Sequence, residues 1–220
     1  MIDHLIRKLR VDPTRVYVVG ASSGAFMAQR LTCERSEDIA AATFVIGTIA
    51  SNILPECSPR APVSMLMING TEDRITPWVG GDSHFGFLKL GKKTSVPKTV
   101  ERWVRRDRCA PSPTVVWEPD DDSADGTRIR CEVYGPCEDW SEVVLYAVEG
   151  GGRTWPGGPQ CLPERIIGKT SADFNAAEVI WRFVQQHAKR QSIFSEGSPD
   201  QVASSHSISH GGAKGHSTTD

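Results

Sequence analysis

The sequence predicts an α/β fold in which a mostly parallel sheet carries helices on both faces. Short runs of β-branched, aromatic and other apolar residues have the composition of buried strands. Between these runs, apolar residues recur at the spacing of amphipathic helices. Alternation of the two patterns favours parallel strands joined by helices. The predicted strands are residues 15–19, 40–49, 63–68 and 143–148, and the predicted helices include Ile2–Leu9, a helix that ends near Glu34, Val96–Arg106 and residues 172–187.

Local signals place the individual elements. Ile2, Leu5, Ile6 and Leu9 form one helical stripe, and the Asp12-Pro13 turn separates that helix from the first strand. In the helix Val96–Arg106, Pro97 lies in the first turn, where a missing N–H costs little. The sequence also predicts a hairpin, which consists of residues 114–118, an acidic turn at 120–126 and residues 127–134.

Composition limits the domain organisation and the partners. The chain of 220 residues suits one domain over residues 1–190, followed by a Ser/Gly/His-rich tail, residues 191–220, that cannot bury enough apolar surface to fold. A net charge of −2 gives no reason to expect nucleic acid or an anionic membrane as partner. No apolar run reaches about 18 residues, so no membrane span is expected, and the first ten residues do not form a signal peptide.

The most informative motif is Gly20-Ala21-Ser22-Ser23-Gly24, which lies between a predicted strand and a predicted helix. A G-x-S-x-G sequence in that position is the nucleophile elbow of the α/β-hydrolases, a sharp turn that exposes the serine Oγ. Ser22 is therefore the candidate nucleophile. The alternative is a Gly/Ser-rich connection that does no chemistry.

An activated serine needs a general base, and the base needs an orienting carboxylate. Asp73 follows the predicted strand 63–68 and is the candidate acid, with Glu72 as its local competitor and a turn cap as the alternative role. The base is expected after the strand 143–148, in a glycine-rich loop, but the residue there is Arg153. A guanidinium has no lone pair to accept a proton, so Arg153 cannot act as general base.

Several motifs in order resemble the secreted polyhydroxybutyrate depolymerases and feruloyl esterase-like enzymes. The resemblance covers about residues 3–187 and includes DPTRVYVVGASSGAFMAQRLTCE, NGTEDRITPWVGG, RDRCAP, EGGGRTWPGG and EVIWRF. It implies that Ser22 is the nucleophile, that Asp73 is the triad acid and that Arg153 stands where the family pattern GGGHTWPGG has the triad histidine. Family members begin earlier, with a signal peptide and further strands, so the chain resembles a domain that lacks its N-terminal strands. The oxyanion donor that remains is the Ser23 N–H.

The resemblance also implies an extracellular protein without a cofactor or metal, and disulfides Cys109–Cys137 and Cys33–Cys57. From the sequence alone, the six cysteines are either disulfides or buried apolar thiols. Trp78 and Trp155 are expected to rim the substrate cleft, or else to be buried under its loops. His84, in an expected loop 80–87, is the candidate substitute base; His4 and His187 are expected to be surface or packing residues.

These observations predict a serine carboxylic ester hydrolase of impaired activity, which acts on small-molecule or polymeric esters. The alternatives are an inactive relative that keeps a ligand-binding cleft and a truncated product without function. The acyl group, the alcohol and the oligomeric state do not follow from the sequence.

Overall fold

The computed structural model describes residues 2–189. The predicted tail, residues 191–220, lies outside the described residues. Within residues 2–189, no helix is long and apolar enough to cross a bilayer.

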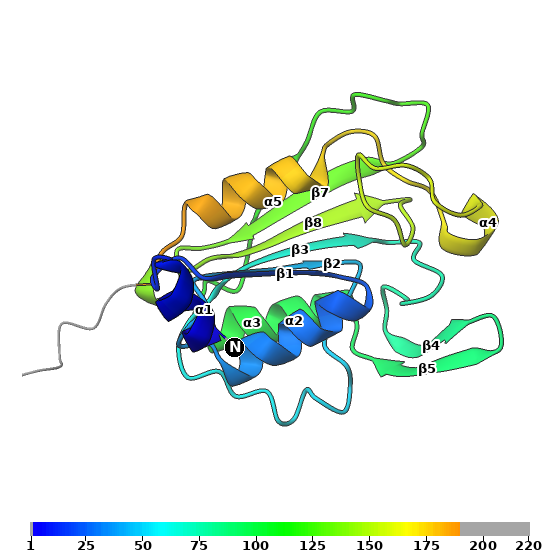
Figure 1. Ribbon diagram of the computed structural model, residues 1–220. Helices are drawn as coiled ribbons and strands as arrows, with labels where there is room; N and C mark the ends of the chain where they lie inside the picture. The colour runs from blue at the N-terminus through cyan, green and yellow to red at the C-terminus, as the bar shows by residue number, and fades with distance from the viewer. Residues whose placement is uncertain (1, 190–220) are drawn as a thin grey trace, which may run out of the picture. The chain divides into compact units, whose positions relative to one another are not determined.

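A six-stranded sheet organises the domain (Figure 1). Its strand order is β1-β2-β3-β8-β7-β6; the first four strands are parallel, and β7 and β6 join in antiparallel pairing. The strands β2 and β3 are buried along their whole length, as expected for parallel strands covered on both faces. The strands are β1 (Tyr17–Ala21), β2 (Ala41–Val45), β3 (Ser64–Gly70), β6 (Thr114–Trp117), β7 (Arg128–Tyr134) and β8 (Val143–Glu149).

Helices cover both faces of the sheet, as predicted (Figure 1). On one face α2 (Ser23–Glu34) and α3 (Val96–Arg106) pack into a core that includes Phe44, Met65 and Trp103. On the other face α5 (Ala176–Gln185) packs against Leu66 and Val148. The remaining helices are α1 (Ile2–Leu9), which buries no residue completely, the short α4 (Glu164–Ile167) and a 3-10 turn at Glu138–Trp140.

The expected loop 80–87 is instead part of a two-stranded hairpin, so that expectation was wrong. The strands β4 (Gly81–Phe85) and β5 (Leu88–Lys93) pair with each other and form a separate sheet. Gly86 adopts φ 58° at the turn, a conformation that suits glycine in a tight hairpin. Because β5 is largely exposed, the hairpin lacks the buried apolar run by which the core strands were predicted.

Two disulfides tie the helices to neighbouring loops, and both pairings were predicted. Cys33–Cys57 joins the end of α2 to the segment before β3, and Cys109–Cys137 joins the segment after α3 to the segment after β7. Disulfides fit an oxidising compartment. The two cysteines that stay free within the described chain are Cys131, whose pKa burial raises to about 11, and the exposed Cys161.

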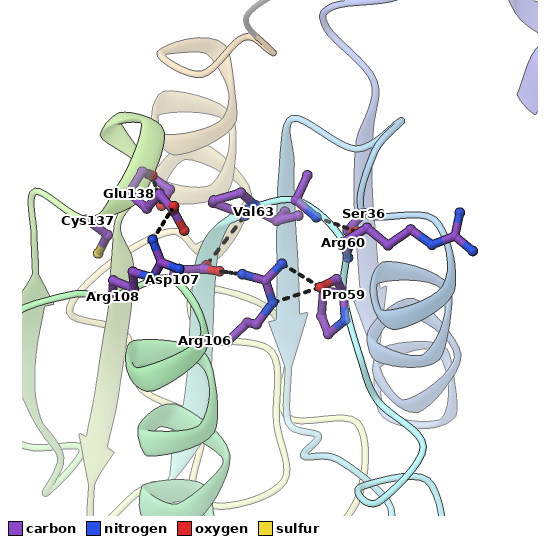
Figure 2. Close-up of polar contacts among 12 residues, drawn as sticks. Ser36, Pro59, Arg60, Val63, Arg106, Asp107, Arg108, Cys137 and Glu138 are labelled. Atoms are coloured by element: carbon purple, nitrogen blue, oxygen red, sulfur yellow. Dashed lines mark hydrogen bonds and ion pairs between the residues drawn. The ribbon is translucent and has the colours of Figure 1, made fainter.

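A second buried acid, Asp107, lies at the end of α3 and was not singled out from the sequence. Figure 2 shows its surroundings: Val63 N donates to Asp107 Oδ2 over 3.4 Å, and Arg106 Nη1 lies 3.9 Å from Oδ1. Arg106 is also held by the Pro59 carbonyl, and Arg108 pairs with Glu138. Burial with so few close donors raises the pKa of Asp107 to about 7.

This raised pKa predicts a pH-dependent stability. The ordinary value is 3.8, so between about pH 4 and pH 7 the folded state holds a proton that the unfolded state has released. The free energy of unfolding should therefore fall as the pH rises through this window, by at most about 4 kcal/mol. Urea unfolding across the window measures this slope.

Asp107→Asn should flatten the slope, because an amide does not titrate. Asp82→Asn, at an exposed carboxyl of β4, is the matched control and should leave it unchanged. Equal slopes in the Asp107→Asn variant and the unmodified chain would exclude Asp107 as the titrating group.

Candidate functional site

The strand β1 leads directly into the motif at Ser22. Ser22 adopts φ 55° and ψ −120° between β1 and α2, a strained conformation for a residue other than glycine. Its N–H donates to Val45 O on the neighbouring strand over 2.9 Å, and its carbonyl accepts from Ala25 N at 3.0 Å. These bonds hold the serine at the N-terminus of α2, with the Ser23 amide at the first helical position.

The two glycines of the motif have different roles. A Cβ atom at Gly20 would lie 2.2 Å from the Gly24 carbonyl oxygen, so Gly20 permits a close approach of backbone. A Cβ atom at Gly24 would meet nothing within 4 Å. The tight turn therefore depends on Gly20, whereas Gly24 has room for a side chain.

Asp73 lies on the loop that follows β3 and is buried. Its Oδ1 accepts from the N–H groups of Ile75 and Thr76, each at 2.8 Å, which fixes the carboxylate. Glu72, the local competitor, is exposed, whereas Asp73 contacts the Arg153 guanidinium that also contacts Ser22. Burial raises the pKa of Asp73, while the charge of Arg153 and the two N–H donors act in the opposite direction.

Arg153 connects all the polar groups of this site. Its Nη2 donates to Ser22 Oγ at 2.6 Å, and its Nη1 lies 3.0 Å from Asp73 Oδ2. Nη1 also reaches Thr76 Oγ1 at 2.7 Å and Ile46 O at 3.2 Å. The structure brings Ser22, Asp73 and Arg153 together. The sequence gave no signal for Thr76 and Ile46, which contact the guanidinium only through tertiary structure.

Glycines allow the loop after β8 to approach β3 and thereby position Arg153. A Cβ atom at Gly70, the last residue of β3, would lie 2.3 Å from Gly151 O, and one at Gly152 would lie 2.1 Å from Ile167 O. Arg153 N donates to Ile167 O, which anchors the residue itself. The arginine side chain, which is 10% exposed, therefore extends from a rigid base toward Ser22.

Lys93, which the sequence did not indicate, adds a second positive charge near the site. Its Nζ stands 4.1 Å from the centroid of the Phe26 ring, one helical turn beyond Ser22. Burial lowers the pKa of Lys93, and the positive charge of Arg153 lowers it further. Both cations therefore act on the same region of the surface.

Within residues 2–189, the predicted tryptophans and histidines make no hydrogen bond or ion pair with Ser22, Asp73 or Arg153. Trp78 packs against the core under α2 and α3, and Trp155 packs against the core under α5. His84 is exposed on β4, and His4 is exposed on α1. His187 follows α5, where its Nε2 lies 3.2 Å from Glu142 Oε1 and its carbonyl accepts from the Tyr17 hydroxyl at the start of β1.

This geometry supplies a serine hydroxyl and a buried acid, but it places a permanent donor between them. The hydrogen-bond contacts of Ser22 Oγ within residues 2–189 come from Arg153 alone, and no histidine of that range contacts it. A proton leaving the serine would need an acceptor, which a guanidinium is not.

Comparison with known proteins shows similarity to esterases. The chain is 28% identical over 198 residues to NocK of Nocardia uniformis subsp. tsuyamanensis, which is named as an esterase, and this alignment covers 84% of the chain and 55% of NocK. It is 28% identical over 153 residues to feruloyl esterase B of Piromyces equi, across 69% of the chain and 27% of that enzyme. The chain thus spans about half or less of the length of these relatives.

The structure of an acetyl xylan esterase from Aspergillus awamori aligns with a TM-score of 0.43 and 16% identity, over 67% of this chain and 58% of that one. No family model matches the chain. Both sequence relatives are named as esterases.

The different roles of the two glycines can be tested by a matched pair of variants. Gly20→Ala should destabilise the fold by about 3 kcal/mol, because the added methyl collides with backbone that cannot move freely. Gly24→Ala should be neutral or stabilise by up to about 1 kcal/mol, because alanine favours the helix. Urea unfolding followed by circular dichroism measures both. If Gly20→Ala and Gly24→Ala lowered the free energy of unfolding equally, the close approach of backbone at Gly20 would be contradicted.

The ion pair of Arg153 and Asp73 should stabilise the fold cooperatively. Arg153→Met leaves a buried carboxylate without its cation and should lower the free energy of unfolding by about 3 kcal/mol. Asp73→Asn should lower the free energy of unfolding by a comparable amount, since the guanidinium then faces an amide. In the double variant, the loss in the free energy of unfolding should be clearly smaller than the sum of the losses in the two single variants. Additive losses in urea unfolding would show that the two side chains are not coupled.

Proposed function

We propose that this chain is a carboxylic ester hydrolase of the serine type whose turnover is impaired by Arg153. Ser22 is the nucleophile, Asp73 is the triad acid and the Ser23 N–H is the oxyanion donor. The observation that carries the proposal is the position of the Arg153 guanidinium, which contacts both Ser22 Oγ and Asp73 Oδ2. The similarity to esterases supports the reaction class.

The impairment follows from proton transfer. Attack of Ser22 Oγ on an ester carbonyl forms the acyl-enzyme, and the hydroxyl proton must pass to a base and then to the leaving alcohol. Arg153 already donates a hydrogen bond to Oγ, which withdraws electron density from the attacking atom. The guanidinium remains protonated, so within residues 2–189 the proton of the hydroxyl has no acceptor among the side chains that contact Ser22 Oγ.

The substrates that we propose are esters of the kinds that the resemblance and the relatives suggest. These are feruloyl or acetyl esters of plant polysaccharides and hydroxyalkanoate polyesters. Trp78 and Trp155 are the proposed contacts for an aromatic acyl group or a sugar. The two disulfides support an extracellular site of action.

A second candidate function is ligand binding without turnover. Arg153 fills the position of a base and satisfies the buried acid, so the site can persist as a stable structure without catalysing the reaction. The positive charges of Arg153 and Lys93 favour this alternative for ligands that carry a negative charge.

Restoring a base distinguishes impaired catalysis from simple absence of an esterase site. Arg153→His should raise kcat/KM for p-nitrophenyl acetate by about 10²–10⁴ over the unmodified chain, the usual contribution of a general base. Release of p-nitrophenol measures the rate. Labelling by a fluorophosphonate reports independently on the nucleophilicity of Ser22.

Two controls make the result specific. Arg153→Gln removes the cation without supplying a base and should stay inactive, and Arg153→His combined with Ser22→Ala should lose the gain. Substantial Ser22-dependent turnover by the unmodified chain would overturn the impairment. If Arg153→His folds cooperatively and neither hydrolyses nor labels, the missing base does not explain the inactivity and the proposal fails.

A further inference from the structure

The Arg153 guanidinium beside Ser22 has hydrogen-bond donors that its protein partners do not use. Nη1 of Arg153 is occupied by three acceptors, and Nη2 makes a single contact, with Ser22 Oγ. Within residues 2–189, Nε and the second hydrogen of Nη2 have no acceptor. The guanidinium thus keeps donor capacity beyond what its protein partners use.

The Ser22 hydroxyl can also donate a hydrogen bond. Because Arg153 donates to its Oγ, the hydroxyl accepts at one lone pair, and its own proton is free to point elsewhere. No acceptor for that proton contacts Oγ within residues 2–189. The neighbouring Ser23 amide, at the first position of α2, adds a further N–H on the same side.

Lys93 is held close to this group of donors. Phe26 lies one helical turn after Ser22, and its N–H donates to the Ser22 carbonyl over 3.3 Å. Lys93 Nζ stands over the Phe26 ring and makes no ion pair or hydrogen bond within the described part of the chain. The bridge between Lys93 and Ala50 fixes β5 against the segment after β2, which begins at Ile46, an acceptor for Arg153.

The balance of charge in this region is positive. Arg153 and Lys93 contribute two cations, and Asp73 is the acid that contacts Arg153. Asp73 is buried, and its oxygens accept from Ile75, Thr76 and Arg153. An anion at the unused N–H groups of Arg153 would therefore interact with two cations and a hydroxyl donor.

We propose that this chain binds organic carboxylates at the site formed by Ser22, Lys93 and Arg153. Lys93 and the unused N–H groups of Arg153 hold the carboxylate oxygens, and the Ser22 hydroxyl donates a further hydrogen bond. A carboxylate can accept at both oxygens from such convergent donors, and charge-assisted hydrogen bonds are the stronger kind. Binding involves no covalent step and does not depend on ester hydrolysis.

The test uses the full chain and two probes of similar shape. Sodium acetate, titrated at constant ionic strength, should cause saturable shifts of the Ser22 and Ser23 amide resonances, whereas acetamide should not. Lys93→Met should weaken acetate binding about tenfold, the effect of losing one charge-assisted hydrogen bond. Lys93→Arg, which keeps the charge, should bind acetate nearly as well as the unmodified chain.

Lys89→Met is the matched control, because it removes an equal charge from an exposed position farther along β5. It should leave the affinity unchanged. The proposal would be overturned if acetate caused no saturable shift or if acetamide bound equally well. It would also be overturned if Lys89→Met and Lys93→Met weakened acetate binding by the same factor. The ester assay of Arg153→His is separate, so a folded but inactive Arg153→His variant together with acetate binding by the unmodified chain would refute hydrolysis alone.

Discussion

The site depends on the guanidinium of Arg153. It joins the turn after β1 at Ser22, the segment after β2 at Ile46 and the loop after β3 at Asp73 and Thr76, while its own backbone follows β8. These four strands are parallel neighbours, so their carboxyl ends meet at one edge of the sheet. One planar cation with several donors can therefore connect all four segments, as a smaller side chain could not.

The same interaction accounts for a site that is well ordered and yet poorly suited to catalysis. Ser22 adopts a strained turn, and two N–H donors hold the Asp73 carboxylate in a fixed orientation. Both features cost free energy, and strained backbone persists only where its surroundings hold it in place. Arg153 provides that support by satisfying the buried carboxylate and donating to the serine. Under the function that we propose, the arrangement would keep the nucleophile and the acid in place while it lacks the proton acceptor that attack requires.

The sequence was most informative where a residue's role depends on its local neighbours. Strand runs, the helix at Val96–Arg106, the serine motif and the acid after β3 all have local signals of composition or spacing. The hairpin β4–β5 was missed because its strands are too exposed to need an apolar pattern. Lys93 and Thr76 were missed because their roles come from contacts with distant segments, which no local pattern encodes. The disulfide pairs were identified through resemblance, since spacing alone permits several pairings.

Two buried carboxylates at opposite ends of β3 show what Arg153 contributes. Asp107 contacts the N–H of Val63, just before β3, over 3.4 Å, and its cation Arg106 lies 3.9 Å away. Asp73, after the other end of the strand, has two N–H donors at 2.8 Å and Arg153 at 3.0 Å. Burial raises the pKa of both acids, but close donors oppose the increase at Asp73 more strongly. Near neutral pH, a protonation change on folding is expected at Asp107, at the other end of β3 from the site. At the site itself, the charge of Arg153 and the two N–H donors oppose the effect of burial on the Asp73 carboxyl, while Lys93 makes no ion pair within residues 2–189 and keeps its charge available for a ligand.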